Sequence, residues 1–591
     1  MAPGLVDRLL EVDLTRQHVD VTEIPPGWQR RYLGGKGLGA RYLYDRVGSD
    51  TLPLGAANVL LVLVGPLTGY LPGDARFAAV TKSPLTGLFL DSYAGGSFGR
   101  SLRGSMPRYA GLAISGKTDQ TTILDLRNEE PQLSPRPDLA GESVDTVDDE
   151  FGAASVLTVG PAGEAGVPFA TIAGDGGDHH AGRGGAGAVM GTKGLKAIVV
   201  DRTDEIEPPT PAIQRLHDAL VAAYETSPYG ESHRSSGTLE TVEFADSTGM
   251  LSSFAWQERG FAGAKSLGIE AVRRSATERE DDRGPIPGDY RVESDAGETV
   301  IRGGAPIALG ANLGVDDFDA VATLGTTCDQ LGLDVISAGN VVALAMLASE
   351  RGAIDRSIEF GDETDAERLI SEIAFRSSGL GNTLAGGVEA AAADLGLDEV
   401  VPTVKAMEVP SFDPRGAPAM ALAYATSDRG ACHRRAVPAT AQVFEPTWTP
   451  TQTAEAVVAE QNRRAALWCL IVDDLATPII TEIGDIWSEA IGVDVHRGEL
   501  DRIGERTWTL TRLFNVREGV AREDDRLPSA FTGADGIDQV WFDRARRRYY
   551  ELRDWDRQGR PSRRLLERLD IDELIDDHTP VGDHPLHADP N

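Results

Sequence analysis

Three features are scarce in this chain of 591 residues, and each scarcity argues against a class of protein. The 3 cysteines, Cys328, Cys432 and Cys469, are too few and too scattered for a disulfide framework or a zinc site. The longest apolar run, NVLLVLVGPL (58–67), is far shorter than the roughly 20 residues that a membrane-spanning helix needs. The opening residues, MAPGLVDRLLEVDLTR, contain no basic stretch followed by an apolar one, so we expect no signal peptide. The sequence therefore predicts a cytoplasmic protein that does not contact a membrane.

Lysine is the third scarce feature. Only 7 of the 57 basic residues are Lys, and 92 Asp and Glu give a formal net charge of -35. Hydrated carboxylates keep a protein soluble in concentrated salt, and the salt screens their mutual repulsion. The balance therefore indicates a halophilic host, with an ordinary acidic protein as the alternative. A field of this sign argues against nucleic acid as a partner.

The length predicts two or three domains, because single hydrophobic cores stop growing near roughly 250–300 residues. Short apolar segments separated by Gly and Pro predict strands in the first third of the chain, at 59–65, 76–82, 111–117 and 195–201. Helical periodicity begins near residue 211 and dominates afterwards, as in 335–352 and 453–475. A polar stretch at 275–304 interrupts the helices and is interpreted as a long loop.

These patterns predict an α+β protein. A β-rich domain (1–203) should be followed by a mainly helical second domain (204–405) and a mainly helical third domain (406–591). The tail of the third domain, from residue 576, carries three His. Metal binding there is one interpretation, and a disordered, solvated end is the one we favour.

Glycine-rich segments gather in the first third of the chain: GGKGLGA (34–40), GPLTGYLPGDARFAAVTKSPLTG (65–87), YAGGSFG (93–99) and AGRGGAGAVMGTKGLKAI (181–198). Such segments let the backbone approach a ligand closely and direct N–H groups at an anion. None matches a phosphate-binding Walker loop, and no βαβ unit surrounds GKGLGA. Because Arg76 and Arg183 are embedded in these segments, the pattern favours an anionic cofactor.

Several of these strings resemble the tungsten-containing aldehyde ferredoxin oxidoreductase family. The resemblance rests on SPLTG (83–87) after RFAAVTK, on GRGGAGAVMGTKGLKAI, on CDQLGLDVISAGN (328–340) and on LAYATSDRGACHRR (422–435). It runs in the family's order from about residue 8 to about 545. It implies a tungsten (or molybdenum) bis-pyranopterin whose metal is held by pterin sulfurs, with no protein side chain as ligand.

The same resemblance implies the residues that hold the cofactor. They are Arg76, Gly95, Gly182 and Arg183 in the first domain and, in a D-x-x-G-L-D motif, Asp329 and Asp334. A carboxylate in such a motif can accept hydrogen bonds from the pterin edge, and a helix cap is the structural alternative. The second copy of the motif is degraded and retains only Asp473. The Asn expected before the 95–96 glycines is Tyr93, and His179 and His180 replace Arg and Ala of the family.

Two further family features bear on catalysis. His433 matches the histidine that exchanges a proton with the reacting oxygen, a role suited to an imidazole near neutral pH. The family's active-site glutamate falls at about Gly304. The four cysteines of the family's [4Fe-4S] cluster fall at Asp281, Gly284, Gly288 and Pro478, and no C-x-x-C exists anywhere in the chain. Since such a cluster needs about four thiolate ligands, we expect that no conventional cluster is bound.

Two hypotheses follow from the resemblance. In the first, the chain oxidises a small aldehyde to a carboxylic acid and passes electrons to an unknown acceptor, with the missing cluster arguing against ferredoxin. In the second, it is a redox-inactive, cofactor-binding or regulatory paralogue. The resemblance also implies a homodimer as one option for the oligomeric state, although no residue decides this.

Overall fold

The first 200 residues form two six-stranded sheets in the computed structural model, which describes residues 6–582 apart from 74, 129, 281–284, 411, 473–485, 487, 490–496 and 534. The first sheet has the order β2 (His18–Glu23), β1 (Arg8–Asp13), β6 (Tyr109–Ser115), β3 (Leu60–Leu63), β4 (Phe77–Lys82), β5 (Phe89–Ala94). The second has the order β11 (His179–Ala181), β10 (Ile172–Gly174), β9 (Ser155–Thr158), β12 (Leu195–Val200), β7 (Thr122–Asp125), β8 (Gln132–Pro135). Neighbours are antiparallel except for the pairs β1–β6 and β12–β7.

Strand β3 shows why the predicted strands are unbroken apolar runs. Successive side chains of a strand point to opposite faces of its sheet. Leu60 and Val62 enter the core between the two sheets, whereas Leu61 and Leu63 enter a core shared with α2 (Gly35–Arg46) and the C-terminal helices. Both faces of this sheet are therefore covered, and alternation with polar residues is absent.

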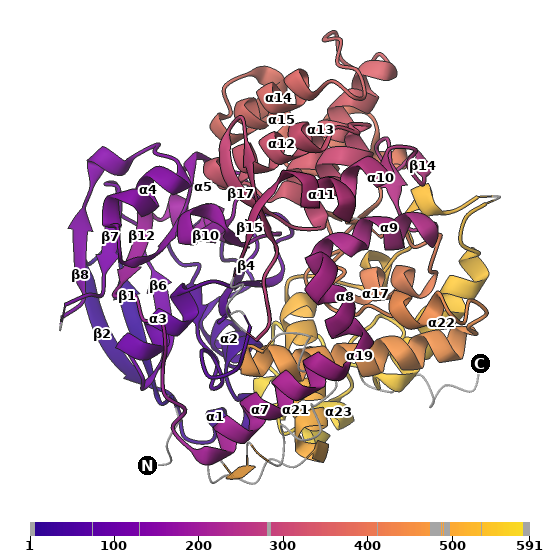
Figure 1. The fold of residues 1–591 in the computed structure, drawn as a ribbon. Helices are drawn as coiled ribbons and strands as arrows, with labels where there is room; N and C mark the ends of the chain where they lie inside the picture. The colour runs from indigo at the N-terminus through magenta and orange to yellow at the C-terminus, as the bar shows by residue number, and fades with distance from the viewer. Residues whose placement is uncertain are drawn as a thin grey trace.

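The middle of the chain is mainly helical. Its main helices are α7 (Pro211–Thr226), α8 (Pro228–Ser236), α9 (Glu240–Ser247), α11 (Ile269–Ser275), α12 (Phe318–Leu331), α13 (Val335–Glu350), α14 (Glu363–Phe375) and α16 (Val388–Leu395). Helix α13 is the centre of this part, with an uninterrupted buried run from Ser337 to Ala348. Figure 1 shows these helices in magenta to salmon, with α11–α14 at the top of the view, α8 and α9 to the right of the β-rich part, and α7 near the bottom.

The prediction of a long loop at 275–304 is wrong for its described residues. Three short antiparallel strands lie there: β15 (Ala276–Arg279), β16 (Tyr290–Ser294) and β17 (Gly297–Ile301). Their side chains are mostly polar because only one face is buried, with Val292 and Ile301 packing on Phe318 of α12. A strand pair covered on one side by a helix needs few apolar residues, so composition alone suggested a loop.

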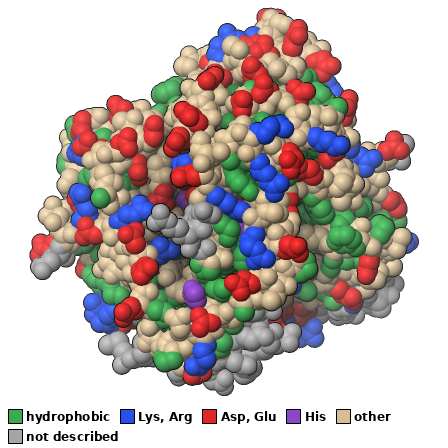
Figure 2. All heavy atoms as spheres, in the orientation of Figure 1, with side chains coloured by type: hydrophobic (Ala, Val, Ile, Leu, Met, Phe, Trp, Pro, Cys, Tyr) green, Lys and Arg blue, Asp and Glu red, His purple; other side chains and the backbone are tan. Residues whose placement is uncertain are grey.

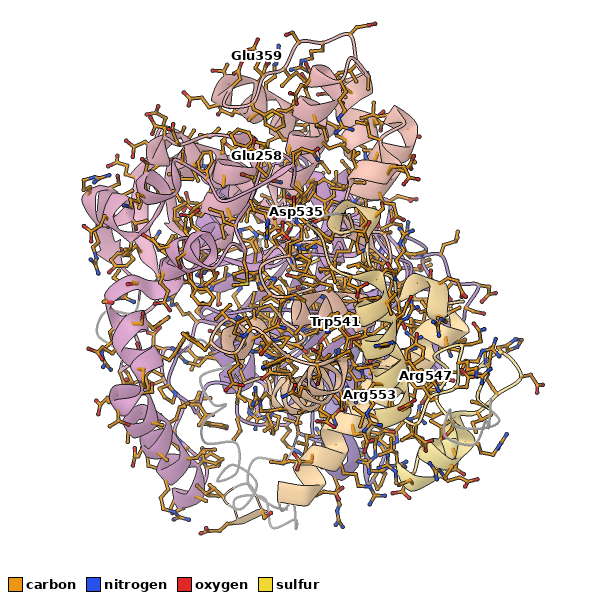
Figure 3. All side chains as sticks on the ribbon, turned by 90° about the vertical axis from the view of Figure 1, so that its right-hand side faces the viewer. Glu258, Glu359, Asp535, Trp541, Arg547 and Arg553 are labelled. Atoms are coloured by element: carbon orange, nitrogen blue, oxygen red, sulfur yellow. The ribbon has the colours of Figure 1, made fainter. Side chains whose placement is uncertain are left out.

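The last part of the chain packs its helices against the first sheet. Its helices are α17 (Ala419–Thr426), α18 (Ala439–Gln442), α19 (Pro450–Leu470), α21 (Arg497–Arg517), α22 (Gln539–Leu552) and α23 (Arg563–Arg568). Helix α22 carries Trp541 and Arg547, and Arg553 follows it on the side of the molecule drawn in Figure 3. The buried Arg553 guanidinium donates to Gln461 Oε1 of α19 at 2.8 Å, which joins the two helices.

The predicted α+β class, with a β-rich first part and helical parts after it, is confirmed. Asp and Glu side chains are spread over the whole face shown in Figure 2 and do not gather in one place. Over the part of the chain that the structure describes, every helix is too short or too polar to cross a bilayer.

Candidate active site

A cavity of about 960 Å³ lies where the β-rich part and both helical parts meet. Of the predicted site residues, six line it together: Arg76, Gly95, Gly182, Asp329, Asp334 and His433. They come from positions up to several hundred residues apart, so only the tertiary fold brings them together. Asp473 and the cluster-register positions Asp281, Gly284 and Pro478 lie outside the described residues. Gly288 and Gly304 are described, and both line the cavity.

Strand pairing brings the first two of these residues together. Phe77 at the start of β4 is paired with Ala94 at the end of β5, so Arg76 and Gly95 lie side by side at one edge of the sheet. The next residue, Gly96, has a φ of 86°, and a Cβ there would overlap the Asp175 carboxylate. Glycine at 96 is thus required both by the backbone and by the close approach of the second sheet.

The D-x-x-G-L-D motif forms the corner between two helices. Asp329 lies in the last turn of α12, and Gly332, with a φ of 72°, ends that helix. Asp334 caps α13, since its Oδ1 accepts a hydrogen bond of 2.9 Å from the Ser337 amide. Asp334 is therefore a helix cap, and the same carboxylate also lines the cavity.

Arg183 is joined to this corner through its backbone. Its amide donates to Asp334 Oδ2 at 3.0 Å, while its guanidinium donates to the carbonyls of Glu408 at 2.6 Å and Ala431 at 3.2 Å. The side chain is buried in the wall and does not line the cavity, unlike that of Arg76. Arg183 therefore ties the loop that carries His433 to the glycine-rich segment.

The neighbouring Gly182 provides a test of this corner. A Cβ at 182 would overlap Asp334 Oδ2, the oxygen that holds the Arg183 amide. We expect Gly182→Ala to lower the free energy of unfolding by about 1–3 kcal/mol through overpacking. Denaturation of the purified variant checks this. The control is Gly379→Ala at the start of α15 (Gly379–Leu384), where a Cβ meets nothing within 4 Å. Equal stability of the two variants would contradict the prediction.

Asp329 shares its carboxylate with two partners. Its Oδ2 accepts from the Thr299 hydroxyl at 2.8 Å, and its Oδ1 lies 3.2 Å from His180 Nε2. His180 Nε2 also lies 2.7 Å from the Gly177 carbonyl, and its Nδ1 lies 2.7 Å from the Thr171 hydroxyl. The His180 that departs from the family pattern thus orients one of the predicted cofactor-binding carboxylates.

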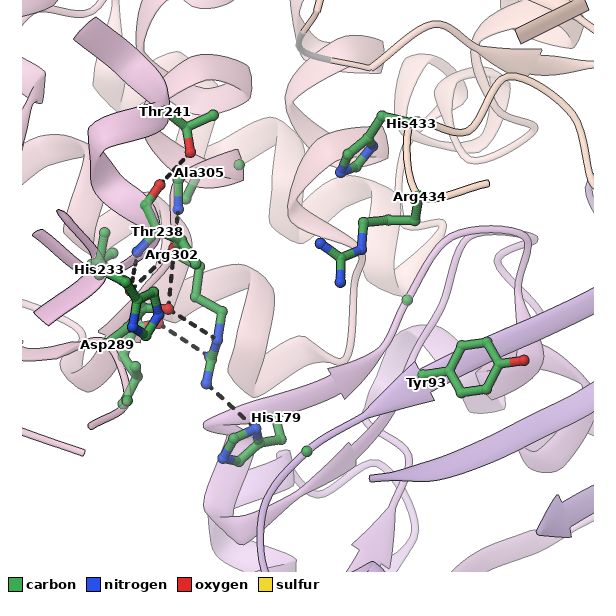
Figure 4. Close-up of a pocket in the computed structure, with 18 of the residues that line it drawn as sticks. Tyr93, His179, His233, Thr238, Thr241, Asp289, Arg302, Ala305, His433 and Arg434 are labelled. Atoms are coloured by element: carbon green, nitrogen blue, oxygen red, sulfur yellow. Dashed lines mark hydrogen bonds and ion pairs between the residues drawn. The ribbon is translucent and has the colours of Figure 1, made fainter. Parts of the chain in front are cut away.

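His433 lies in the wall of the helical third part, next to Arg434 (Figure 4). Its ring contacts that of Phe412 edge to face, with centroids 5.8 Å apart. Burial, together with the Arg434 and Arg183 guanidiniums, holds the pKa of His433 well below its usual value. The imidazole is therefore neutral at pH 7 and can accept a proton.

This pKa makes stability depend on pH. In the unfolded chain a histidine titrates near 6.5, whereas the folded protein keeps His433 neutral to lower pH. Below pH 6.5 the unfolded state binds more protons than the folded state. The free energy of unfolding is therefore highest above pH 6.5 and decreases as the pH falls below that value. We expect the melting temperature of the wild type to fall more steeply between pH 7 and pH 5 than that of His433→Gln. If the melting temperatures of the two proteins fall in parallel with pH, the lowered pKa of His433 is contradicted.

A buried ionic network holds the loop that carries His433. Lys36 of α2 lies 3.2 Å from Asp91 of β5 and 2.5 Å from Asp428, and Arg435 lies 2.7 Å from Asp91. All four side chains are at most 2% exposed. Burial alone would raise the pKa of Asp91, but the Arg435 and Lys36 cations lower it by more than burial raises it. The carboxylate is therefore ionised.

The same network positions Tyr93 on the cavity wall. The Tyr93 hydroxyl donates to Asp91 Oδ2 at 2.6 Å, and its ring stacks on Trp468 of α19 with centroids 4.1 Å apart. Sequence reasoning missed Lys36, Asp91 and Trp468. One signal was available, because Lys36 is one of only 7 lysines and stands inside a glycine-rich segment.

A second ionic group, also missed from the sequence, forms the opposite wall of the cavity (Figure 4). Glu280 lies 2.9 Å from His179 Nε2 and 3.0 Å from the Arg302 guanidinium. Arg302 also lies 3.9 Å from the buried Asp289, whose carboxylate accepts from the Thr238 amide at 2.6 Å. Through these residues the strands β15–β17 form part of the cavity wall, and none of these residues is a cysteine.

No described residues form a group of three or more His, Cys, Asp or Glu placed to hold a metal ion. The three cysteines are free and buried, and burial raises the pKa of Cys469 to about 11. Any metal of this site would therefore need ligands from outside the described side chains, such as the sulfurs of a pterin.

Comparison with known proteins places the whole chain in one family. Residues 9–202 match the model for the N-terminal domain of aldehyde ferredoxin oxidoreductase, and residues 215–571 match that for its domains 2 and 3. The tungsten-containing aldehyde ferredoxin oxidoreductase of Pyrococcus furiosus is 30% identical over 96% of this chain and 99% of its own. That of Thermococcus kodakarensis is 29% identical over 96% and 99%.

More distant relatives share the fold. The WOR-like subunit of an aliphatic sulfonate oxidoreductase of Pyrococcus furiosus is 25% identical over 96% of this chain and 97% of its own. The active-site complex BamBC of benzoyl-coenzyme A reductase superposes with a TM-score of 0.85 at 21% identity, covering 97% of this chain and 98% of that one. The three relatives found by sequence are named as oxidoreductases. The chain belongs to the aldehyde ferredoxin oxidoreductase family and is an enzyme of that type.

Proposed function

We propose that the protein oxidises aldehydes to carboxylic acids at a tungsten or molybdenum bis-pyranopterin held in the cavity. The observation that carries this proposal is the meeting of Arg76, Gly95, Gly182, Asp329, Asp334 and His433 around one cavity of about 960 Å³. A cavity of this size suits a large ligand, since sites for drug-sized molecules span roughly 300–1,000 Å³. The names of the Pyrococcus and Thermococcus relatives support tungsten and aldehyde as metal and substrate.

The residues present fit such a cofactor. Gly95 and Gly182 contribute no side chain to the wall beside Arg76 and Asp334, so a flat pterin can approach the backbone. The Arg76 guanidinium can bind phosphate oxygens, and the Asp329 and Asp334 carboxylates can accept hydrogen bonds from pterin N–H groups. When bound, the metal cofactor supplies oxygen transfer and takes up two electrons.

The reaction converts an aldehyde and water into a carboxylic acid, two protons and two electrons. Neutral His433 has a ring nitrogen with a free lone pair that can accept one of the protons. We further propose that the electrons leave by a route other than a conventional [4Fe-4S] cluster, because the chain has only 3 cysteines and the described ones are free and buried. A soluble one-electron acceptor that reaches the cofactor directly would take them in two steps.

The alternative is a redox-inactive, cofactor-binding paralogue, which is favoured by the loss of both the cluster cysteines and the carboxylate expected at Gly304. One experiment separates the two. The protein is purified from cells grown with tungstate, its tungsten, molybdenum and iron are measured, and aldehyde-dependent reduction of benzyl viologen is assayed. Tungsten or molybdenum without stoichiometric iron, together with dye reduction, supports the first. Metal without dye reduction supports the paralogue, and a protein with neither metal refutes both.

A further inference from the structure

The part of the cavity that lies between His433 and the wall across from it has an apolar lining. Across the cavity from His433 lies the segment Gly303–Ala305, as Figure 4 shows for Ala305. The side chains that line this part are Ile307, Val335, Ile336, Phe412 and Val437. Four of them, all but Ile307, are only half buried although they lie inside the molecule, because they face the cavity. Such a lining gains free energy by covering apolar ligand surface.

Two consecutive glycines flatten this wall, for different reasons. A Cβ on Gly303 would overlap the Thr238 carbonyl oxygen, so packing requires glycine there. A Cβ on Gly304 would meet only the Ile336 side chain, at an ordinary contact distance of 3.5 Å. Gly304 also lacks the positive φ that favours glycine. Neither packing nor backbone conformation explains glycine at 304, and its effect is to leave space in the cavity.

The geometry on the other side of that space suits a ring. Phe412 and His433 meet edge to face at 5.8 Å with an interplanar angle of 66°, so both rings present surface to the cavity. A π-helical turn, Pro306–Gly310, follows Gly304–Ala305 directly and is fully buried. Turns of this kind occur frequently at functional sites. The wall that carries Gly304 is thus continuous with a fully buried turn.

Resting on the oxidation proposed above, we infer that this space binds an aromatic aldehyde, with its ring between Ile336 and Phe412 and its carbonyl toward His433. A small aliphatic aldehyde would leave much of the apolar lining in contact with water. A phosphorylated aldehyde would have to lose the hydration of its charge where it faces Ile336 and Phe412, which is costly unless the phosphate reaches one of the arginines of the cavity, such as Arg434. Gly304 is then a specificity-determining position, since any larger side chain there occupies the space of the ring.

The first test compares substrates. With benzyl viologen as oxidant, two equivalents per aldehyde, we expect kcat/KM for benzaldehyde to exceed that for acetaldehyde and for glyceraldehyde 3-phosphate by at least about tenfold. Gly304→Val is expected to lower kcat/KM for benzaldehyde by at least about tenfold and that for acetaldehyde by less than about twofold. The matched control is Gly379→Val, at a site where a Cβ meets nothing within 4 Å. Preference for either other aldehyde, or an equal loss for both substrates in Gly304→Val, overturns the inference.

The second test does not need turnover. Calorimetric titration of the purified protein with benzoate and acetate should show tighter binding of benzoate, weakened at least about tenfold by Gly304→Val but not by Gly379→Val. If no aldehyde is oxidised and this pattern still appears, the proposed oxidation fails while the aromatic site stands. If benzoate binds no better than acetate, or binds Gly304→Val equally well, the aromatic site is refuted whatever the assay shows.

Discussion

Asp91→Asn is expected to lower the free energy of unfolding by about 3–5 kcal/mol, because it leaves the buried cations Lys36 and Arg435 with Asp428 as their one remaining carboxylate in the network. Asp91 is in contact with Lys36 at 3.2 Å and Arg435 at 2.7 Å, and its own backbone carbonyl accepts from Arg429 at 2.7 Å. Its side chain is fully buried, so water cannot replace the lost charge. An amide of the same shape keeps the packing, removes the charge, and replaces one of the two accepting oxygens by an NH2 group that cannot accept a hydrogen bond.

The expected loss extends to the site. Asp91 accepts from the Tyr93 hydroxyl and pairs with Arg435, which lies two residues after His433. Tyr93 and His433 both line the cavity. The two parts of the cavity wall that carry them therefore depend on the Asp91 carboxylate. We therefore expect purified Asp91→Asn to contain less tungsten per chain than the wild type even under conditions where it remains folded.

Denaturant unfolding followed by tryptophan fluorescence measures the first effect, since Trp468 and Trp508 lie beside the network. The control is Glu270→Gln, which removes the same charge from an exposed pair with Arg273 and should cost less than about 1 kcal/mol. A cost for Asp91→Asn as small as that of the control would show that the network carries no net stability. Such a result would also remove it as the anchor of the His433 loop.

The parts of the fold that sequence predicted are those set by local periodicity. Strand β3 was predicted because Leu60 to Leu63 form an unbroken apolar run, and α13 because apolar residues recur over its whole length. The corner at Asp329–Asp334 combines a helix end at Gly332 with a helix cap at Asp334, both of which have local signals. Strands β15–β17 were missed because a strand covered by a single helix carries few apolar residues.

The site was only partly predictable, because its electrostatics depend on contacts between distant segments. Lys36 and Asp428 are 392 positions apart, yet their charged groups lie 2.5 Å from each other. No spacing rule connects two such residues, and each alone looks like a surface charge. Arg183 shows the converse, since its motif suggested a cavity residue whereas its guanidinium binds the carbonyls of Glu408 and Ala431. The motifs identified the positions of site residues, but only the fold shows which way each side chain points.

The second large effect is expected for His433→Gln, which should lower kcat for aldehyde oxidation by about 10²–10⁴-fold, the usual contribution of a general acid–base group. Glutamine preserves a polar side chain of similar reach beside Phe412 but cannot take up a proton. Because His433 is neutral in the folded protein, its replacement removes no charge, and Arg434 and Arg183 keep their surroundings. Tungsten content and melting temperature at pH 7 should therefore match the wild type.

That combination separates a catalytic role from a structural one. Replacing a residue that only supports the wall would lower the activity, the metal content and the stability of the protein together, as expected for Asp91→Asn. For His433→Gln, the loss should fall on kcat, with KM for the aldehyde nearly unchanged, because the apolar lining formed by residues such as Ile336 and Val437 remains intact. Full activity of the variant would exclude His433 as the proton acceptor. The next candidate would then be the ionisable pair His179 and Glu280 on the opposite wall, 2.9 Å apart.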